Sequence, residues 1–410
     1  MRSPALLIAA GCGIQVLNLL SFATYPTLLP ELQVEWRLSN TEAGWISGIY
    51  FAGYVLAVAL LTSLTDRVDP KRIYIASMAV SVIAPVGFAL AADGLWSASL
   101  WRLLQGIGLA GTYMPGLRIL TDQLPDGAQS RGVAFYTASF SIGVSASYYL
   151  SGLLAPAFGW QWAFAATALG PVGAMAVAAF VFESRPVAAE RPTSGVLDFR
   201  PVIANRSALA YTLAYAAHNA ELFAFRSWLV AFLVFSQGLQ AGGGGLGWTA
   251  ATLMALISLA SMPASILGNE LAVRFDRQRY VVIAMLISAA VGCAFGFLAA
   301  NAFWIVVAAA VLYMVTISSE SSAVTAGVVH SAEPRFKGAT MAMHSVIGFI
   351  GALIGPLVFG VVLDLGGGSR DVQAWGLAFA AMSGIMLLGP LALVRLIGLR
   401  ARQGRTHSSS

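Results

Sequence analysis

Very few ionisable residues lie inside the long apolar stretches of this 410-residue chain. They are three arginines, two glutamates and two histidines: Arg102, Arg118, Arg226, Glu221, Glu320, His218 and His344. An ionisable group inside a membrane costs about 2.5–3.5 kcal/mol on insertion scales, so such a group usually faces a cavity or a partner. Guanidinium groups bind carboxylates, and a carboxyl group can carry a proton. These residue types therefore suit the binding of a charged solute and of protons.

Polar side chains share one face of each of two expected helices, near 97–121 and 208–236, when successive residues are placed 100° apart. The first face carries arginine and tyrosine, and the second carries tyrosine, asparagine and arginine. We expect a small polar organic solute to bind between these faces, and the arginines favour an organic anion. The residues assigned to this binding site are Arg102, Tyr113, Tyr215, Asn219 and Arg226.

Two glutamates, Glu221 and Glu320, are candidates for proton coupling. Glu221 lies near the middle of its expected helix, and Glu320 is flanked on both sides by serines. A carboxyl group that is shielded from water takes up a proton more readily, which would let it load and release protons. Each could equally be a helix-packing carboxyl group that neighbouring helices or serine hydroxyls satisfy, and the sequence leaves both interpretations open.

Other polar residues have simpler interpretations. Arg118 is typical of an arginine that reaches the membrane surface, and His344 is expected to be structural. His218 and Glu221 could join a metal site only with further ligands that the sequence does not indicate. The glycine run 242–245 lacks the Lys-Ser/Thr of a phosphate-binding loop. We therefore expect neither a metal nor another cofactor.

The elements that carry these residues are apolar segments of membrane-spanning length. The chain is 58% hydrophobic and only 10% charged, with a mean hydropathy of +0.78. A helix needs about 20 residues to cross the hydrocarbon core. The pattern predicts an all-α membrane protein with twelve transmembrane helices near 5–28, 41–64, 72–92, 97–121, 131–156, 160–182, 208–236, 246–271, 279–300, 303–329, 338–363 and 373–397.

Positive charge fixes the expected orientation. Eighteen Lys and Arg residues fall in the segments at one side of the predicted helices, and only Arg37 and Arg370 fall in the loops at the other side. The positive-inside rule then predicts a multi-pass protein of the cytoplasmic (inner) membrane with both termini in the cytoplasm. The net charge of +5 follows from this topology, so we expect no nucleic-acid partner.

The chain also contains an internal repeat. Residues 64–72 align with residues 271–279 at an offset of 207, and Leu, Arg, Asp and Arg coincide. We predict an N-terminal six-helix bundle over 1–182 and a C-terminal six-helix bundle over 208–397. A cytoplasmic linker at 183–207 separates them, and a cytoplasmic tail follows at 398–410. Two repeated halves with a site between them are typical of alternating-access carriers.

Three motifs carry a family resemblance. The loop Ser63-Leu-Thr-Asp-Arg-Val-Asp-Pro-Lys-Arg72 resembles the signature loop of the major facilitator superfamily (MFS). Arg102-Leu-Leu-Gln-Gly106 resembles the second signature, Arg-x-x-Gln-Gly, and Gly159-Trp-Gln-Trp-Ala-Phe164 is also similar to the family. The loop departs from the signature at Asp69-Pro70, and the helix near 131–156 lacks the Gly-Pro pair of drug/proton antiporters.

The resemblance implies an MFS fold of two pseudo-symmetric six-helix bundles that rock about a central cavity. It also implies conformational gating by loop charges, which we assign to Asp66, Arg67, Arg72 and Arg274. We expect a monomeric, proton-coupled symporter in the lipid bilayer that carries a small-molecule solute. Two alternatives stay open, namely an exporter of hydrophobic drugs or metabolites and a membrane sensor. The short loops lack a catalytic constellation, so we do not expect an enzyme.

Overall fold

The computed structural model describes residues 3–184, 200–240 and 247–398, and every regular element in these ranges is a helix. Most of the predicted linker, nearly all of the predicted tail and the glycine run 242–245 lie outside the described residues.

The N-terminal half contains six crossings. Two of them are interrupted: the first by the turn η1 and the sixth between α7 and α8. In chain order the elements are α1 (Pro4–Asn18), η1 (Leu19–Ser21), α2 (Thr24–Glu35), α3 (Asn40–Leu64), α4 (Pro70–Ala91), α5 (Leu95–Gln123), α6 (Asp126–Phe158), α7 (Trp160–Thr167) and α8 (Leu169–Val181). The first crossing continues past its predicted end at 28 to Glu35, because the chain resumes a helix after the turn.

The C-terminal half repeats this plan after the short helix α9 (Arg200–Ala204). Its crossings are α10 (Arg206–Gly238), α11 (Ala250–Leu259) with α12 (Ser261–Phe275), α13 (Arg277–Phe295) with η2 (Gly296–Ala300), and α14 (Phe303–Ser319) with α15 (Ser321–Ser331), followed by η3 (Pro334–Phe336) with α16 (Lys337–Leu365), and α17 (Val372–Met386) with α18 (Leu388–Ile397). All twelve predicted ranges therefore fall on helical crossings.

Ten of the crossings in the described residues are long and apolar enough to span a membrane. The other two are α5 and α6, which have 29 and 33 residues and are long enough to cross by length alone. Arg102 and Gln105 on α5 are among the buried polar residues that make this helix less apolar. Polar groups inside a membrane usually face a site or a partner, so the buried polar residues of α5 need neighbours within the protein.

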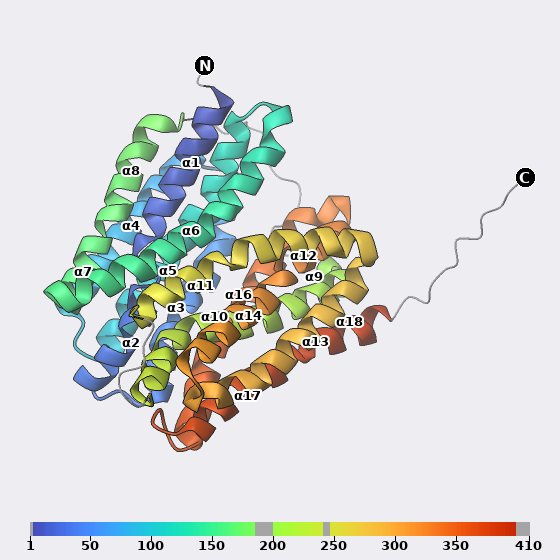
Figure 1. The fold of residues 1–410 in the computed structure, drawn as a ribbon. Coiled ribbons are helices and arrows are strands. Elements are labelled where there is room, and N and C mark those ends of the chain that lie inside the picture. The colour runs from blue at the N-terminus through green and yellow to red at the C-terminus, as the bar shows by residue number, and fades with distance from the viewer. Residues whose placement is uncertain (1–2, 185–199, 241–246, 399–410) are drawn as a thin grey trace, which may run out of the picture.

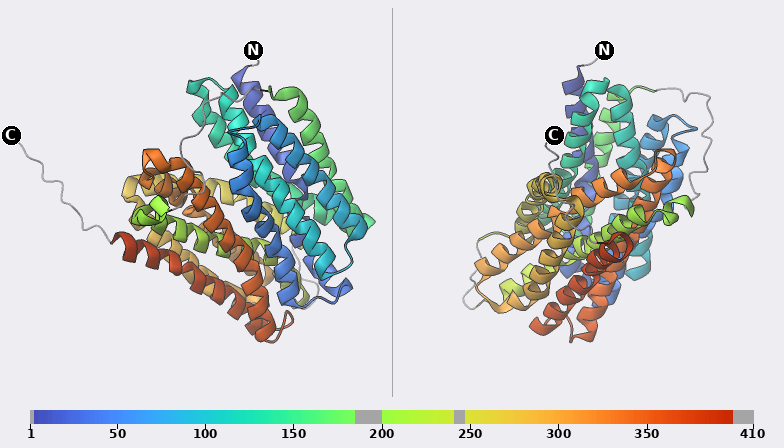
Figure 2. Two further views of the ribbon diagram at one scale, coloured as in Figure 1. Left: turned by 180° about the vertical axis from the view of Figure 1, so that it is seen from behind. Right: turned by 90° about the vertical axis from the view of Figure 1, so that its right-hand side faces the viewer.

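The two bundles converge at one end and diverge toward the end where the chain termini lie (Figures 1 and 2). We call the end near Pro4 and Ile397 the terminal face and the end near Glu35 and Leu365 the opposite face. The hydrogen bonds that join the halves lie between the middle of the helices and the opposite face. They link Ser141 to Ser261, Ser145 to Ala255, Tyr148 to Arg226, and Asn40 and Thr41 to Asp364.

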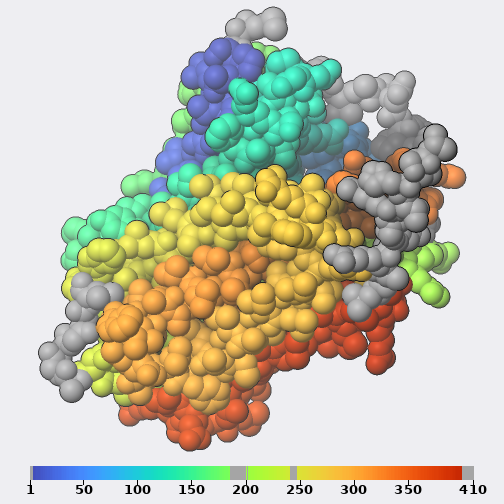
Figure 3. Space-filling model, turned by 45° about the vertical axis from the view of Figure 1, so that its right-hand side comes forward, coloured from blue at the N-terminus to red at the C-terminus, as the bar shows by residue number. Residues whose placement is uncertain are grey.

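Two helix pairs form the seam between the bundles. α3 packs along α16, and α6 packs along α11 and the start of α12. Figure 3 shows α11 and α12 in yellow along the edge of the N-terminal half. The second half of the first crossing, α2, also contacts α10. In each pair the second crossing of one half packs against the fifth crossing of the other, so the two pairs correspond to each other, as the pseudo-symmetric fold requires.

Glycines let α3 and α5 approach closely inside the N-terminal bundle. A side chain at Gly106 would collide with the main-chain oxygen of Tyr50, and one at Gly53 would collide with that of Leu103. Neither neighbour can retreat, because both clashing atoms belong to helix backbone. This close contact sets the position of Arg102, which lies one turn before Gly106 on α5.

Replacing Gly106 by leucine is therefore expected to destabilise the fold by about 3 kcal/mol, as overpacking does in other cores. The measurement is the thermal midpoint of the purified protein, followed by fluorescence-detected size-exclusion chromatography after heating. Gly384→Leu is the matched control, because a side chain there meets nothing within 4 Å. An unchanged thermal midpoint for Gly106→Leu would show that α3 and α5 can move apart without loss of stability.

Candidate functional site

Arg102 lies buried in the N-terminal half, and none of the acidic residues that the structure describes forms an ion pair with it. Its guanidinium carbon is 4.5 Å from the ring centre of Tyr50 and 5.4 Å from that of Tyr25. Its Nη1 donates to Oε1 of Gln105 at 2.8 Å, while its Nε, also buried, has no hydrogen-bond partner. Aromatic rings and one amide hold the positive charge, which leaves donor capacity for an anionic group.

Arg226 of α10 has a similar environment across the seam. Its guanidinium carbon lies 5.7 Å from the ring centre of Phe223, and its buried Nε is without a hydrogen-bond partner. The hydroxyl of Tyr148, on α6, donates to the main-chain oxygen of Arg226 at 2.6 Å. Tyr148 also interacts electrostatically with both Arg226 and Arg102, so this tyrosine places the two cations in one region between the halves.

Neither of these two arginines forms an ion pair with a carboxylate in the described part of the chain. They are 3% and 6% exposed, and a buried charge without a counter-charge is costly. One anion placed between such cations from opposite halves would supply a counter-charge to both of them. That both residues bind the solute stays a prediction.

A second polar cluster lies inside the C-terminal half and joins His218 to Glu320. Nδ1 of His218 lies 2.9 Å from Oε1 of Glu320, and both side chains are fully buried. The remaining oxygen of Glu320 accepts a longer hydrogen bond of 3.4 Å from Ser319. Nε2 of His218 is buried without a partner. The pair can share a proton, because the imidazole nitrogen and the carboxylate oxygen can each accept the proton that lies between them.

Glu221 is the other buried acid, and two hydroxyls satisfy it. Ser288 donates to Oε2 and Tyr313 donates to Oε1, both at 2.9 Å. Glu221 interacts electrostatically with Glu320. Two buried carboxylates repel each other, and a single proton relieves the repulsion. No group of three or more metal-ligating side chains that could hold a metal ion occurs among the described residues.

The remaining predicted solute residues lie on the terminal side of the arginines. Tyr215 stacks on His344 with ring centres 4.1 Å apart, and Asn219 is buried beside it. Tyr113 packs edge-on against Phe140 with ring centres 5.5 Å apart. Tyr54, from α3, lies near both Tyr113 and Tyr215. These side chains therefore lie at a different level of the helices from the two arginines.

An aromatic layer separates these two groups of residues. It is made of Phe51 from α3, Phe223 from α10 and Phe349 from α16, and Phe51 and Phe223 have ring centres 4.4 Å apart. Tyr54 continues the layer through a 4.2 Å ring contact with Phe349. An apolar or aromatic part of a solute would find contact surface here.

The predicted gating residues lie at the terminal face. Asp66 accepts a hydrogen bond from Arg118 at 2.5 Å, and the same Nη1 donates to Thr65 at 2.6 Å. Arg118 is therefore more than an arginine that reaches the membrane surface, because it ties the α3–α4 turn to α5. The other gating candidates, Arg67, Arg72 and Arg274, are exposed.

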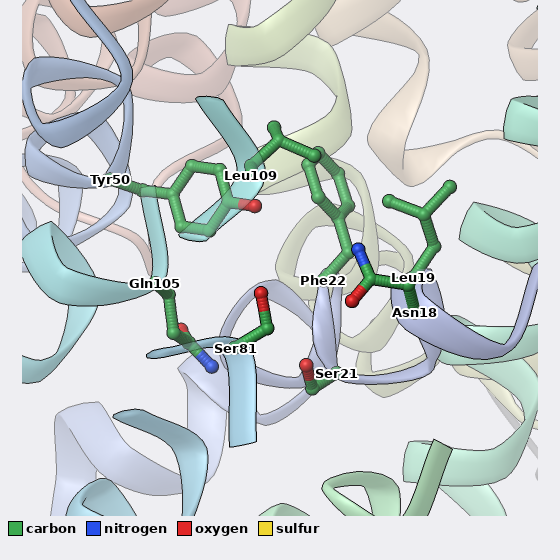
Figure 4. A pocket seen from close by; sticks show the side chains of 8 residues that line it. All are labelled: Asn18, Leu19, Ser21, Phe22, Tyr50, Ser81, Gln105 and Leu109. Carbon is green, nitrogen blue, oxygen red and sulfur yellow. The ribbon is translucent and has the colours of Figure 1, made fainter. Parts of the chain in front are cut away.

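A small polar pocket adjoins Arg102 within the N-terminal half. Figure 4 shows the side chains of Asn18, Ser21, Ser81 and Gln105 around it, together with the ring of Tyr50. The buried atoms Asn18 Oδ1 and Gln105 Nε2 have no hydrogen-bond partner. The sequence pattern indicates Gln105, through the Arg102–Gly106 motif, but not Asn18, Ser21 or Ser81, because single small polar residues are common in transmembrane helices.

Comparison with known families decides the classification. The sequence model of the Major Facilitator Superfamily matches residues 11–266 and 222–410, which together cover nearly the whole chain. The chain belongs to this superfamily. The resemblance inferred from the signature motifs is confirmed, and so is the all-α MFS fold, with which the predicted twelve helices are consistent.

Several curated MFS transporters are similar over part of the chain. The niacin transporter NiaP of Acinetobacter baylyi is 25% identical over 137 residues, which are 33% of this chain and 31% of that protein. The sphingosine-1-phosphate transporter SPNS2 of Danio rerio is 25% identical over 251 residues, or 58% of this chain and 49% of that protein. The chain thus matches less than half the length of these relatives. Family and relatives place it among transporters rather than enzymes.

Solved MFS structures share the fold over the whole length. The nucleoside transporter NupG superposes with a TM-score of 0.74 at 16% identity, covering 96% of this chain and 100% of that one. A bacterial homologue of the human lysosomal transporter Spinster, inward-facing and occupied, gives a TM-score of 0.72 at 18% identity, covering 97% and 96%. At these identities the similarity shows the fold alone.

Proposed function

We propose that the protein is a secondary carrier that moves a small organic anion across the cytoplasmic membrane by alternating access. The observation that carries this proposal is the pair of buried arginines, Arg102 and Arg226, which belong to opposite halves, both lie near Tyr148 and form no ion pair with a carboxylate of the described residues. An anion bound between them would accept hydrogen bonds from both guanidinium groups, supply the counter-charge that they lack, and join the two halves.

The relatives support an anionic solute. Niacin carries a carboxylate, and sphingosine-1-phosphate carries a phosphate, so each relative's name specifies an anion. The aromatic layer of Phe51, Phe223 and Phe349 favours an anion that also has an apolar or aromatic part. The same layer keeps the export of hydrophobic compounds as a second candidate function.

Protons are the proposed coupling ion, moved in symport with the solute. Glu320 carries the proton together with His218, and Glu221 contributes through its repulsion of Glu320. Both acids are buried, so a change in solvation between two states of the carrier would change their protonation. Neither a cofactor nor a metal takes part in this scheme.

Tyr113, Tyr215 and Asn219 are assigned to the path by which the solute leaves the arginines. They lie toward the terminal face, where the two bundles diverge (Figure 2). With both termini in the cytoplasm, as the positive-inside rule predicts, this path would lead to the cytoplasm. Asp66, Arg67, Arg72 and Arg274 then lie at the cytoplasmic side and act when that side closes. The carrier works as a monomer in the lipid bilayer.

The decisive experiment is uptake by proteoliposomes that contain the purified full-length protein. A proton gradient, inside alkaline, is imposed in the presence of a radiolabelled organic acid such as niacin, an organic amine or a neutral sugar. The proposal predicts gradient-driven accumulation of an acid and none of the amine or sugar. Accumulation of amines or sugars alone would overturn it, and transport of hydrophobic dyes would favour the second candidate.

A further inference from the structure

Asp364, at the end of α16, binds the beginning of α3 in the other half of the molecule. Its Oδ1 accepts hydrogen bonds from the main-chain N–H of Asn40 at 3.1 Å and from Nδ2 of the same residue at 2.7 Å. Its Oδ2 accepts from the main-chain N–H of Thr41 at 2.8 Å and from Oγ1 at 2.6 Å. One carboxylate therefore makes four hydrogen bonds across the seam at the opposite face.

These contacts complete the set of hydrogen bonds at the start of α3. The first N–H groups of a helix lack partners within the helix. Ser39 and Glu42 form a capping box, in which the Ser39 hydroxyl accepts from the N–H of Glu42. The N–H groups of Asn40 and Thr41 are satisfied by Asp364 alone. Each half of the molecule thus supplies part of one helix cap.

The helices around this contact approach closely because of glycines. A side chain at Gly360 of α16 would collide with the main-chain oxygen of Asn40. One at Gly44 or Gly48 of α3 would collide with main-chain oxygens of Pro356 or Leu353 of α16. The negative carboxylate also lies at the positive end of the α3 dipole. Shape and charge are therefore complementary along the outer part of the α3–α16 seam.

We propose that Asp364 is a gating residue that holds the opposite face closed and must release α3 each time that face opens. The proposal rests on the alternating access proposed above and does not depend on the solute. Asp364 is exposed, so water can replace its hydrogen bonds when the halves separate. This makes the contact reversible, and removing it should shift the equilibrium between closed and open states about three- to tenfold.

The test measures the distance between the halves at the opposite face by double electron–electron resonance. Spin labels are placed at Ala91→Cys, the last residue of α4, and Ala302→Cys, just before α14, after the native Cys12 and Cys293 are replaced by serine. Both alanines are exposed. In the reconstituted full-length protein without solute or gradient, Asp364→Asn is expected to raise the ratio of long to short distances about three- to tenfold.

Two variants keep the interpretation specific. Glu42→Gln weakens the cap of α3 within its own half, so it should leave the ratio unchanged. Thr41→Val removes one side-chain donor to Asp364 and should shift the ratio in the same direction as Asp364→Asn, by a smaller factor. Equal ratios in wild type and Asp364→Asn would overturn the proposal, as would an equal shift in Glu42→Gln. The uptake assay tests the solute separately, so a negative uptake result would not change the outcome of this distance measurement.

Discussion

Replacing Arg226 by alanine is expected to lower the initial rate of anion uptake by about 100-fold. Truncating one partner of a buried charge pair typically costs about 2–5 kcal/mol, and each 1.4 kcal/mol is a factor of ten. In this carrier the second partner is the solute, so the loss falls on transport. The fold should persist, because no carboxylate is left unpaired and the hydrogen bond from Tyr148 ends on the main chain of Arg226.

The rate is measured with radiolabelled anion in proteoliposomes, and the thermal midpoint of each variant is recorded alongside. Arg102→Ala should also lose uptake, with some loss of stability because its contacts with Tyr50 and Tyr25 disappear. Arg335→Ala is the matched control, since this exposed arginine also lies over an aromatic ring, that of Phe336, outside the site. Full uptake by both site variants would refute an anion bound between these arginines.

A lysine at position 226 separates charge from geometry. Lysine keeps the positive charge but cannot donate the paired hydrogen bonds of a guanidinium group. If the anion is a carboxylate held by both groups, Arg226→Lys should retain uptake between that of wild type and Arg226→Ala. Equal rates for Arg226→Lys and Arg226→Ala would mean that the donor geometry matters more than the charge.

The number and position of the helices could be predicted from the sequence because the membrane imposes one length on every crossing. Apolar runs of about 20 residues, bounded by charges, were sufficient even for α5 and α6, which are less apolar than the others. The interruption of the first crossing at Leu19–Ser21 was not predicted, since its residues are as apolar as the helix around them.

The site could be predicted only in part. Arg102, Arg226 and Glu320 became candidates because ionisable residues are rare in apolar segments. Each one is costly to insert in a membrane unless it faces a cavity or a partner. The partners of these groups could not be identified in this way. His218 and Glu320 are 102 residues apart, and Asp364 and Asn40 are 324 residues apart. Helical periodicity relates residues on one helix, and it carries no information about which faces meet between helices.

Replacing Glu320 by glutamine is expected to abolish accumulation of the solute against its gradient while allowing exchange. Glutamine has nearly the same shape and can still hydrogen-bond His218, but it cannot bind and release a proton near neutral pH. Without the proton carrier the imposed pH gradient cannot drive the solute, so the inside-to-outside concentration ratio should fall to about one. Counterflow between vesicles and medium at equal pH should remain, because it needs only solute binding and movement of the halves.

Glu221→Gln is the comparison variant, because it removes the other buried carboxylate of the described residues. Both oxygens of Glu221 accept hydrogen bonds, from Ser288 and Tyr313, and an amide nitrogen can accept neither. This variant should therefore lose thermal stability more than Glu320→Gln does. If accumulation in Glu320→Gln equals that of wild type, Glu320 is a packing group and the proton must move elsewhere. If exchange is lost together with accumulation, Glu320 serves the movement of the halves or the binding of solute, and its assignment as the proton carrier is wrong.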